Sequence, residues 1–227
     1  MYSVFFSKMD IAMDIIASRL KEIIKEESKV LIFPWAFPVE ITSEEFESDY
    51  FPIGGRRYNK YLDSLKKINI KEENCIVCNP YKHSSEELKR LINESDVLVF
   101  PGGNPEMFFK KVLHDKEIIY DIKHFKGIVI GESAGTELQL KRYFITSTNN
   151  FYKYFAFYDG FGLIDDPFYM DVHTMNEENY IKELQYASNN TKKTIYAIYD
   201  NGVLLYNRET NELEQFGHIE IINPISE

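Results

Sequence analysis

Cysteine, positive charge and long apolar runs are all scarce in this sequence. Only two of its 227 residues are cysteines, Cys75 and Cys78, so a reducing, cytoplasmic setting is the simplest interpretation. No apolar run approaches the roughly 20 residues that a membrane span needs. The N-terminus lacks the basic and apolar regions of a secretory signal. These absences favour a protein that is neither secreted nor embedded in a membrane.

Basic residues are outnumbered: 26 Lys and Arg stand against 36 Asp and Glu, for a formal net charge of -10. Binding nucleic acid through a general electrostatic footprint needs clustered Lys and Arg, so that class of function is disfavoured. The remaining composition is ordinary, with 44% hydrophobic and 15% aromatic residues, and can build a core of normal size. We expect residues 1–227 to form a single α/β domain.

The first 130 residues alternate between helical and strand patterns. Apolar residues recur at helical spacing over 9–26 and 56–67, and Ser84 with Glu87 forms a capping box for another helix. Further helices are expected from 105 and over 116–124. Short apolar runs predict strands at 30–33, 75–78, 97–100 and 128–130. Such strands, separated by helices, predict a doubly wound, mostly parallel sheet with helices on both faces.

The pattern becomes richer in strands after residue 140. Candidate strands are 194–199, 203–206 and 218–222, which we expect to be antiparallel additions near the C-terminus. Asn201-Gly202, between the first two, is a strong signal for a hairpin turn.

The loop most informative about function is Gly131-Glu132-Ser133-Ala134-Gly135. Ligands bind an open parallel sheet at the carboxyl ends of its strands. Gly-x-Ser-x-Gly between an apolar strand and a helix is typical of a nucleophile elbow, which lifts the serine hydroxyl clear of the sheet. The alternative is a Gly-rich packing turn. We favour Ser133 as the nucleophile of a hydrolase.

A second glycine loop, Pro101-Gly102-Gly103-Asn104-Pro105, also follows an apolar strand. Acyl transfer needs two N–H donors aimed at one developing oxyanion. Gly103 and Ala134 are the natural pair for this oxyanion hole. The alternative is that the glycines only make a sharp turn between strand and helix.

A serine nucleophile also needs a base, and His173 is the candidate. It follows Ser133 in the chain, in a segment that we expect to end a strand. Ser, then acid, then His is the chain order seen when an elbow serine lies on an α/β sheet. The other four histidines occupy a polar loop, charged helical stretches or a late strand; they are His83, His114, His124 and His218.

These residues give the sequence a resemblance to the family of serine peptidases that contains aspartyl dipeptidase (dipeptidase E) and cyanophycinase. The resemblance covers most of the chain and implies a fold similar to class I glutamine amidotransferases. It also implies a Ser-His-acid triad, no metal and no cofactor. Its motifs occur in the family's order: Val30–Pro38, Phe100–Asn104, Gly131–Gly135, and Gly160–Ile164 followed by Asp171-Val172-His173.

The acid of the triad is harder to identify. In the dipeptidase branch it falls shortly after a strand that follows the serine, where this sequence has no carboxylate and Asn150 matches best. An amide can orient an imidazole, but it cannot stabilise imidazolium as a carboxylate does. Asp159 and Asp171 are alternative third members.

We therefore expect a serine-type hydrolase that cleaves small peptides or related amides through an acyl-enzyme on Ser133. The alternative, motivated by the missing carboxylate near Asn150, is a catalytically weakened homologue that binds a small ligand or a partner. Ammonia transfer is disfavoured because the elbow residue is serine. The expected partner is a small peptide substrate, with no nucleic acid and no membrane, and we leave a homodimer open.

Overall fold

The centre of the molecule is a sheet of eight strands in the order β10-β9-β1-β5-β4-β2-β3, with β8 paired to β9 off this path. The computed structural model describes residues 1–37, 39–147 and 152–225. Five neighbouring strands are parallel: β1 (Tyr2–Phe6), β5 (Ile128–Glu132), β4 (Val97–Phe100), β2 (Val30–Ile32) and β3 (Cys75–Val77). The predicted mostly parallel sheet is confirmed, although β1, now at its centre, was not among the predicted strands.

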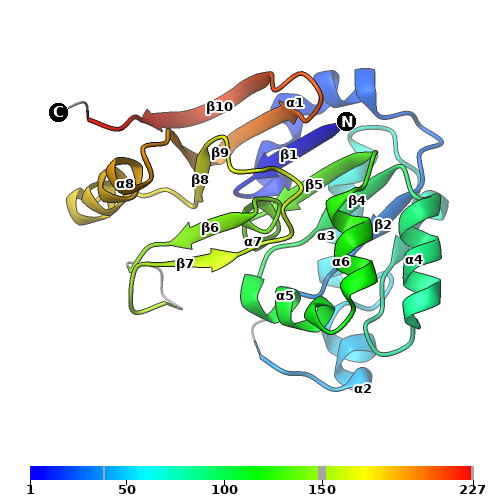
Figure 1. Ribbon diagram of the computed structural model, residues 1–227. Helices are drawn as coiled ribbons and strands as arrows, with labels where there is room; N and C mark the ends of the chain where they lie inside the picture. Colours follow the sequence, from blue (N-terminus) through cyan, green and yellow to red (C-terminus); the bar gives the residue numbers. More distant parts are fainter. Residues whose placement is uncertain (38, 148–151, 226–227) are drawn as a thin grey trace.

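Helices cover both faces of this sheet (Figure 1). Alternate residues of a strand point to opposite faces, so Val4 and Phe6 of β1 belong to one apolar cluster and Phe5 belongs to the other. The first cluster lies under α1 (Met9–Ile23) and α3 (Arg56–Lys66). The second lies under α4 (Ser85–Glu94), α5 (Pro105–Leu113), α6 (Lys116–Lys123), α7 (Ala134–Glu137) and α8 (Glu178–Thr191).

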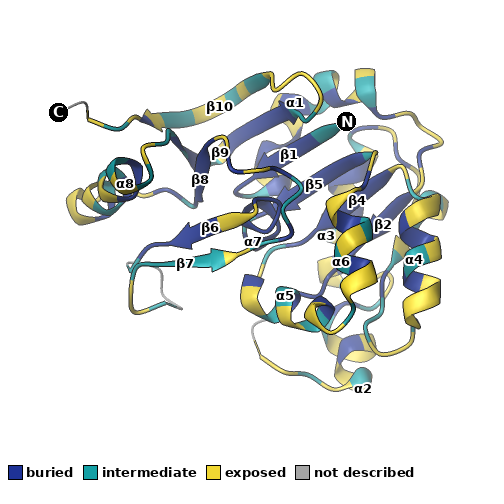
Figure 2. Ribbon diagram, viewed as in Figure 1, coloured by how far each residue is buried: buried dark blue, intermediate teal, exposed yellow. Residues whose placement is uncertain are grey.

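Burial follows this layering (Figure 2). The inner strands β1, β2, β4, β5 and β8 are almost wholly buried, whereas β3, β7 and β10 are largely intermediate or exposed, and α4 and α6 expose one side each to solvent. Ser84 caps α4 through the predicted capping box with Glu87. Three short helical segments complete the set: α2 (Ser43–Glu45), η1 (Phe46–Tyr50) and η2 (Glu72–Asn74). Within the described residues, no helix is long and apolar enough to cross a membrane.

The hairpin predicted at Asn201-Gly202 is wrong, because β9 (Ile195–Asn207) passes through both residues as one strand of 13 residues. Its partner β10 (Leu213–Ile222) shifts register between Gly217 and Ile219. A Cβ on Gly202 would lie 2.3 Å from the carbonyl oxygen of His218. The glycine therefore allows β10 to approach closely at an irregularity of the ladder, and the chain turns only after Asn207.

One edge of β9 has two different neighbours along its length. Its first half, up to Ile198, pairs in parallel with β8 (Tyr169–Val172), and its second half, from Val203, pairs antiparallel with β1. β8 and β1 thus run toward each other, and their carboxyl ends meet opposite residues 199–202. The Ser7 hydroxyl joins the two ends: it donates to the Ile198 carbonyl at 2.6 Å and accepts from the His173 N–H at 2.8 Å.

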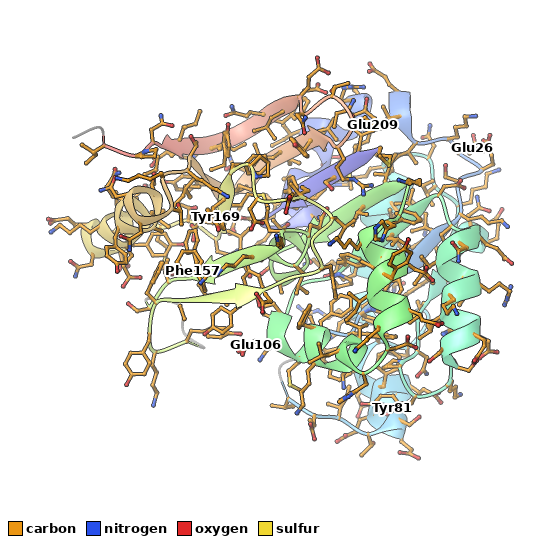
Figure 3. The ribbon with its side chains drawn as sticks, in the orientation of Figure 1. Glu26, Tyr81, Glu106, Phe157, Tyr169 and Glu209 are labelled. Carbon is orange, nitrogen blue, oxygen red and sulfur yellow. The ribbon has the colours of Figure 1, made fainter. Side chains whose placement is uncertain are left out.

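A separate antiparallel hairpin, β6 (Arg142–Ile145) and β7 (Ala156–Asp159), packs beside the main sheet. Aromatic rings attach it: Phe157 on β7 meets Tyr169 on β8 edge-to-face, with ring centroids 5.8 Å apart (Figure 3). The hairpin therefore packs against β8, with Phe157 beside the first residue of that strand.

Candidate active site

Ser133 lies in a strained turn between β5 and α7. Its φ is +51°, a left-handed conformation that non-glycine residues rarely adopt. The turn is tight, because a Cβ on Gly135 would lie 1.9 Å from the Phe100 carbonyl oxygen. The result is a serine hydroxyl at the carboxyl end of a central strand, directly before the N-terminus of a helix.

His173 is the first residue after β8 and also has a positive φ, +59°. Because β8 runs toward the end of β1, which neighbours β5, the imidazole reaches Ser133. Its Nε2 lies 2.9 Å from Ser133 Oγ. The structure thus brings together the two residues that the sequence analysis offered as nucleophile and base.

The other ring nitrogen of His173 contacts a residue that the sequence analysis missed. Nδ1 lies 2.9 Å from Asp200 Oδ1, and Lys8 Nζ lies 2.6 Å from Asp200 Oδ2. Asp200 belongs to the stretch of β9 between the ends of β8 and β1. Partial burial works to raise the pKa of Asp200, but the hydrogen bonds from Lys8 and His173 outweigh it and hold that pKa below its usual value.

Neither Asp171 nor Asp159, both offered earlier as the third member, takes this place, which is a correction. Asp171 is buried on β8, where its Oδ2 accepts hydrogen bonds from Thr174 Oγ1 (2.7 Å) and Tyr180 Oη (2.6 Å). Asp159 is exposed at the end of β7, opposite Arg142. Asn150 lies outside the described residues. Asp171 is not the partner of the His173 ring because it lies two residues earlier, still within β8. The chain turns only at His173, the residue with the positive φ.

Gly103 and Ala134, the pair expected to form an oxyanion hole, follow the neighbouring strands β4 and β5. Gly103 has a φ of +144°, and a Cβ there would lie 1.7 Å from the Ala36 carbonyl oxygen, which itself accepts from the Asn104 N–H at 2.7 Å. Among the described residues, no acceptor takes a hydrogen bond from the N–H of Gly103 or Ala134. Both residues line the same cavity as Ser133.

Glu132, next to the serine, is buried and fully bonded. Its Oε1 accepts from Lys60 Nζ at 2.6 Å and from the Met9 N–H at 3.0 Å, and its Oε2 accepts from the Tyr61 hydroxyl. The Tyr61 oxygen in turn accepts from the Gly102 N–H at 3.2 Å. This network ties α1, α3 and the Gly102-Gly103 loop to the strand that carries Ser133.

Two cavities open on either side of Ser133. One, of about 280 Å³, is lined by Lys8, Lys60 and Glu132, and the other, of about 470 Å³, by Glu137 and Asp171. Arg57 lines both, with its guanidinium 4.3 Å from the Tyr50 ring centroid. No cluster of three or more His, Cys, Asp or Glu suited to a metal occurs in the part of the chain that the structure describes.

This arrangement can activate a hydroxyl. A serine whose Oγ–H points at an imidazole can lose its proton to that ring, and a carboxylate on the far nitrogen holds the ring in the required tautomer. Two free N–H groups beside the hydroxyl can stabilise an oxyanion. Each component is within 3 Å of the next from Ser133 to Lys8.

Lys8 and Asp200 escaped the sequence analysis for different reasons. Asp200 precedes Asn201-Gly202, which locally indicates a turn, and it follows the histidine, whereas the acid was expected before it. Lys8 follows a strand of only five residues that the analysis did not predict. The sequence signal that could have identified Asp200 was its place as a lone acid at the carboxyl end of the apolar segment 194–199.

Known structures and proteins share this fold and parts of this sequence. A candidate peptidase E protein from Listeria monocytogenes EGD-e superposes with a TM-score of 0.62 at 17% identity, covering 94% of this chain and 96% of its own. A peptidase from an acI-B1 actinobacterium superposes with a TM-score of 0.68 at 14% identity, covering 99% of this chain and 91% of its own. At these identities the likeness shows the fold.

One curated protein matches a shorter segment. Cobyrinate a,c-diamide synthase of Methanocaldococcus jannaschii is 29% identical over 75 residues, which make up 33% of this chain and 16% of that protein. The model of peptidase family S51 matches residues 56–213, well over half of the chain and including Ser133, His173 and Asp200. The family resemblance drawn from the motifs is thereby confirmed: this chain belongs to peptidase family S51.

Proposed function

We propose that the protein is a serine-type peptidase that cleaves small peptides or related amides through an acyl-enzyme on Ser133. The observation that carries the proposal is the chain of contacts from Ser133 Oγ through His173 to Asp200, 2.9 Å at each step. Membership of a peptidase family supports it. Cavities of about 280 and 470 Å³ suit a substrate of a few residues.

In this proposal His173 Nε2 takes the proton from Ser133 Oγ as that oxygen attacks the scissile carbonyl. The N–H groups of Gly103 and Ala134 donate to the oxygen that becomes negative. His173 then gives its proton to the leaving nitrogen, the C–N bond breaks, and the acyl group stays on Ser133. Water, deprotonated by His173, releases the acid product and restores the serine.

Asp200 gives His173 the partner that this cycle needs. With Nδ1 protonated, the ring donates to Asp200 Oδ1 and leaves Nε2 free to accept from Ser133. The carboxylate also stabilises the imidazolium that forms while the proton is on the ring. Lys8, on the other oxygen of Asp200, helps to keep this carboxyl ionised.

The alternative of a catalytically weakened homologue rested on the absence of an acid for His173. Asp200 removes that reason, so no observation now favours a binding module over an enzyme. Ammonia transfer is also left without support in the site, where the residue beside His173 is a serine.

A fluorophosphonate probe tests the proposal directly, because it reacts covalently with an activated serine. We expect the wild-type protein to be labelled at Ser133, and Ser133→Ala to be unlabelled. Ser147→Ala, which removes a hydroxyl bonded to Glu183 rather than to an imidazole, is the matched control and should be labelled like wild type. The proposal would be contradicted if the intact protein were not labelled, or if Ser133→Ala were labelled as strongly as the wild type.

A further inference from the structure

Two buried acids line the larger cavity beside Ser133, and the proposed peptidase mechanism does not use them. Glu137 and Asp171 both line it, and their residues are only 8% and 6% exposed. Glu137 lies one helical turn after Ser133, and its N–H bonds the Ser133 carbonyl at 3.3 Å. Residues four apart lie on the same side of a helix, and Glu137 lines the same cavity as Ser133.

The two acids differ in how their oxygens are satisfied. Asp171 Oδ2 accepts hydrogen bonds from Tyr180 and Thr174. The Glu137 carboxylate has no hydrogen bond and no ion pair within the described residues. A buried polar group without a partner is costly and rare in native proteins. An unpartnered carboxylate that faces a substrate cavity calls for a partner from the ligand.

Charge selects the kind of ligand. Among the described residues, no Lys or Arg forms a hydrogen bond or an ion pair with Glu137 or Asp171. The groups that interact with Glu137 are Asp171 and the neutral tyrosines 143, 152 and 180. Lys8 and Lys60 line the other cavity and are already paired with Asp200 and Glu132. Arg57 lines both cavities, but its guanidinium lies over the Tyr50 ring and it is not among the groups that act on Glu137 or Asp171. The Glu137 side therefore attracts positive charge and repels a carboxylate.

We propose that Glu137 and Asp171 bind a cationic group of the substrate, an ammonium or a guanidinium, next to the carbonyl that Ser133 attacks. This inference rests on the proposed peptidase function. Two sources supply such a cation: the α-ammonium of a free N-terminus, or a Lys or Arg side chain. Either would pair with Glu137 and with the Asp171 oxygen that Tyr180 and Thr174 leave open.

Matched dipeptides separate these sources. Lys-Ala and norleucyl-Ala share a four-carbon side chain that carries a terminal ammonium only in Lys-Ala, and each peptide can be N-acetylated. If the cation is the side chain, kcat/KM should fall roughly ten- to hundredfold from Lys-Ala to norleucyl-Ala, the value of a charge-assisted hydrogen bond. If it is the α-ammonium, N-acetylation should cause that loss with both peptides. N-acetyl-norleucyl-Ala cleaved as well as Lys-Ala would overturn the inference.

Variants link the preference to the two acids. Glu137→Gln and Asp171→Asn should each reduce the preference for the cationic peptide by roughly tenfold or more. Asp159→Asn removes an exposed carboxylate elsewhere and should keep the preference. A preference unchanged in Glu137→Gln would count against the proposed pairing.

Binding to Ser133→Ala, followed by calorimetry, tests the cavity without catalysis. Lys-Ala should bind this variant more tightly than N-acetyl-norleucyl-Ala, and the difference should shrink when Glu137→Gln is added. Equal binding of the two peptides refutes the cationic subsite even when the wild type is labelled by fluorophosphonate. Selective binding by a protein that fluorophosphonate does not label would instead refute the peptidase function and leave the subsite standing.

Discussion

Ser133 lies between two regions of the molecule whose acids have opposite surroundings. On the side of α1, α3 and β9, each carboxylate near the serine has a lysine: Lys60 bonds Glu132 and Lys8 bonds Asp200. On the side of α7 and β8, Glu137 and Asp171 have none. The lysine-paired arrangement fixes the geometry of the site, because neighbouring elements bond every oxygen of Glu132 and Asp200. The arrangement without lysines leaves the charge of Glu137 and Asp171 available to a ligand, and it lowers the stability of the folded state.

The largest expected effect is on the paired side. Asp200→Asn should keep a hydrogen bond to His173 but hold the wrong tautomer, so kcat should fall by about 10⁴-fold. Steady-state kinetics measure the loss, and an unchanged melting temperature would show that the fold survives. A loss below about tenfold would mean that Asp200 does not act as the triad acid.

Glu132→Gln should destabilise the protein by about 3 kcal/mol, because it removes the buried charge that Lys60, Tyr61 and the Met9 N–H hold and leaves Lys60 only the more exposed Asp10, at 3.5 Å. Thermal or urea unfolding measures this change in the free energy of unfolding. Glu94→Gln, which breaks an exposed pair with Arg90 on α4, is the control and should cost no more than about 0.5 kcal/mol. Comparable losses in the two variants would contradict the role given to the Glu132 network.

Glu137→Gln should have the opposite sign and raise stability at neutral pH by about 1 kcal/mol. Burial raises the pKa of Glu137 well above its usual value and that of Asp171 to about 6, the latter against the hydrogen bonds of Tyr180 and Thr174. The unfolded chain releases these protons near pH 4, whereas the folded protein releases them only at higher pH.

The direction in which stability changes with pH follows from this difference in pKa between the folded and unfolded states. Because the unfolded state binds fewer protons, the free energy of unfolding should fall as the pH rises from about 4 toward about 6, the pKa of Asp171 in the folded protein. The gain from Glu137→Gln should therefore be absent at pH 4 and clear at pH 8, as measured by melting temperature. A gain of equal size at both pH values would show that charge is not its cause.

Lys8→Met should have the smallest effect, about a two- to fivefold loss of kcat/KM at pH 7, because an exposed ion pair is worth little. The side chains of Lys8 and Asp200 are 43% and 40% exposed. The difference from wild type should narrow in about 1 M NaCl, where charges are screened over about 3 Å. A loss as large as that of Asp200→Asn would give Lys8 a part beyond holding Asp200 in place.

Much of the fold could be predicted because its signals are local. Each parallel strand after β1 is a continuous apolar run beside a helix with helical spacing, and Ser84 and Glu87 mark their helix start by a capping box. Ser133 and His173 stand out in the same way, since a short motif and the end of a strand identify them.

Asp200 could not be found locally, because its place depends on how distant strands pair. Asn201-Gly202 has the composition of a turn, yet β10 lies along β9 on both sides of it. Gly202 is needed where the His218 carbonyl comes close, a requirement set by another strand. Whether such a residue lies in a turn or in a strand is decided by tertiary contacts.

The single strand β9 also determines when the site can exist. Within the described sheet, β8 pairs with β9 alone, and the Ser7 hydroxyl that joins β8 to β1 bonds to Ile198, 191 residues later. Ser133 and His173 are synthesised before this strand, but they have no frame to hold them together until it arrives. A ribosome that has translated the chain as far as α8 therefore carries the nucleophile and the base without a working site. Activity begins only once the last strands have been made and have entered the sheet.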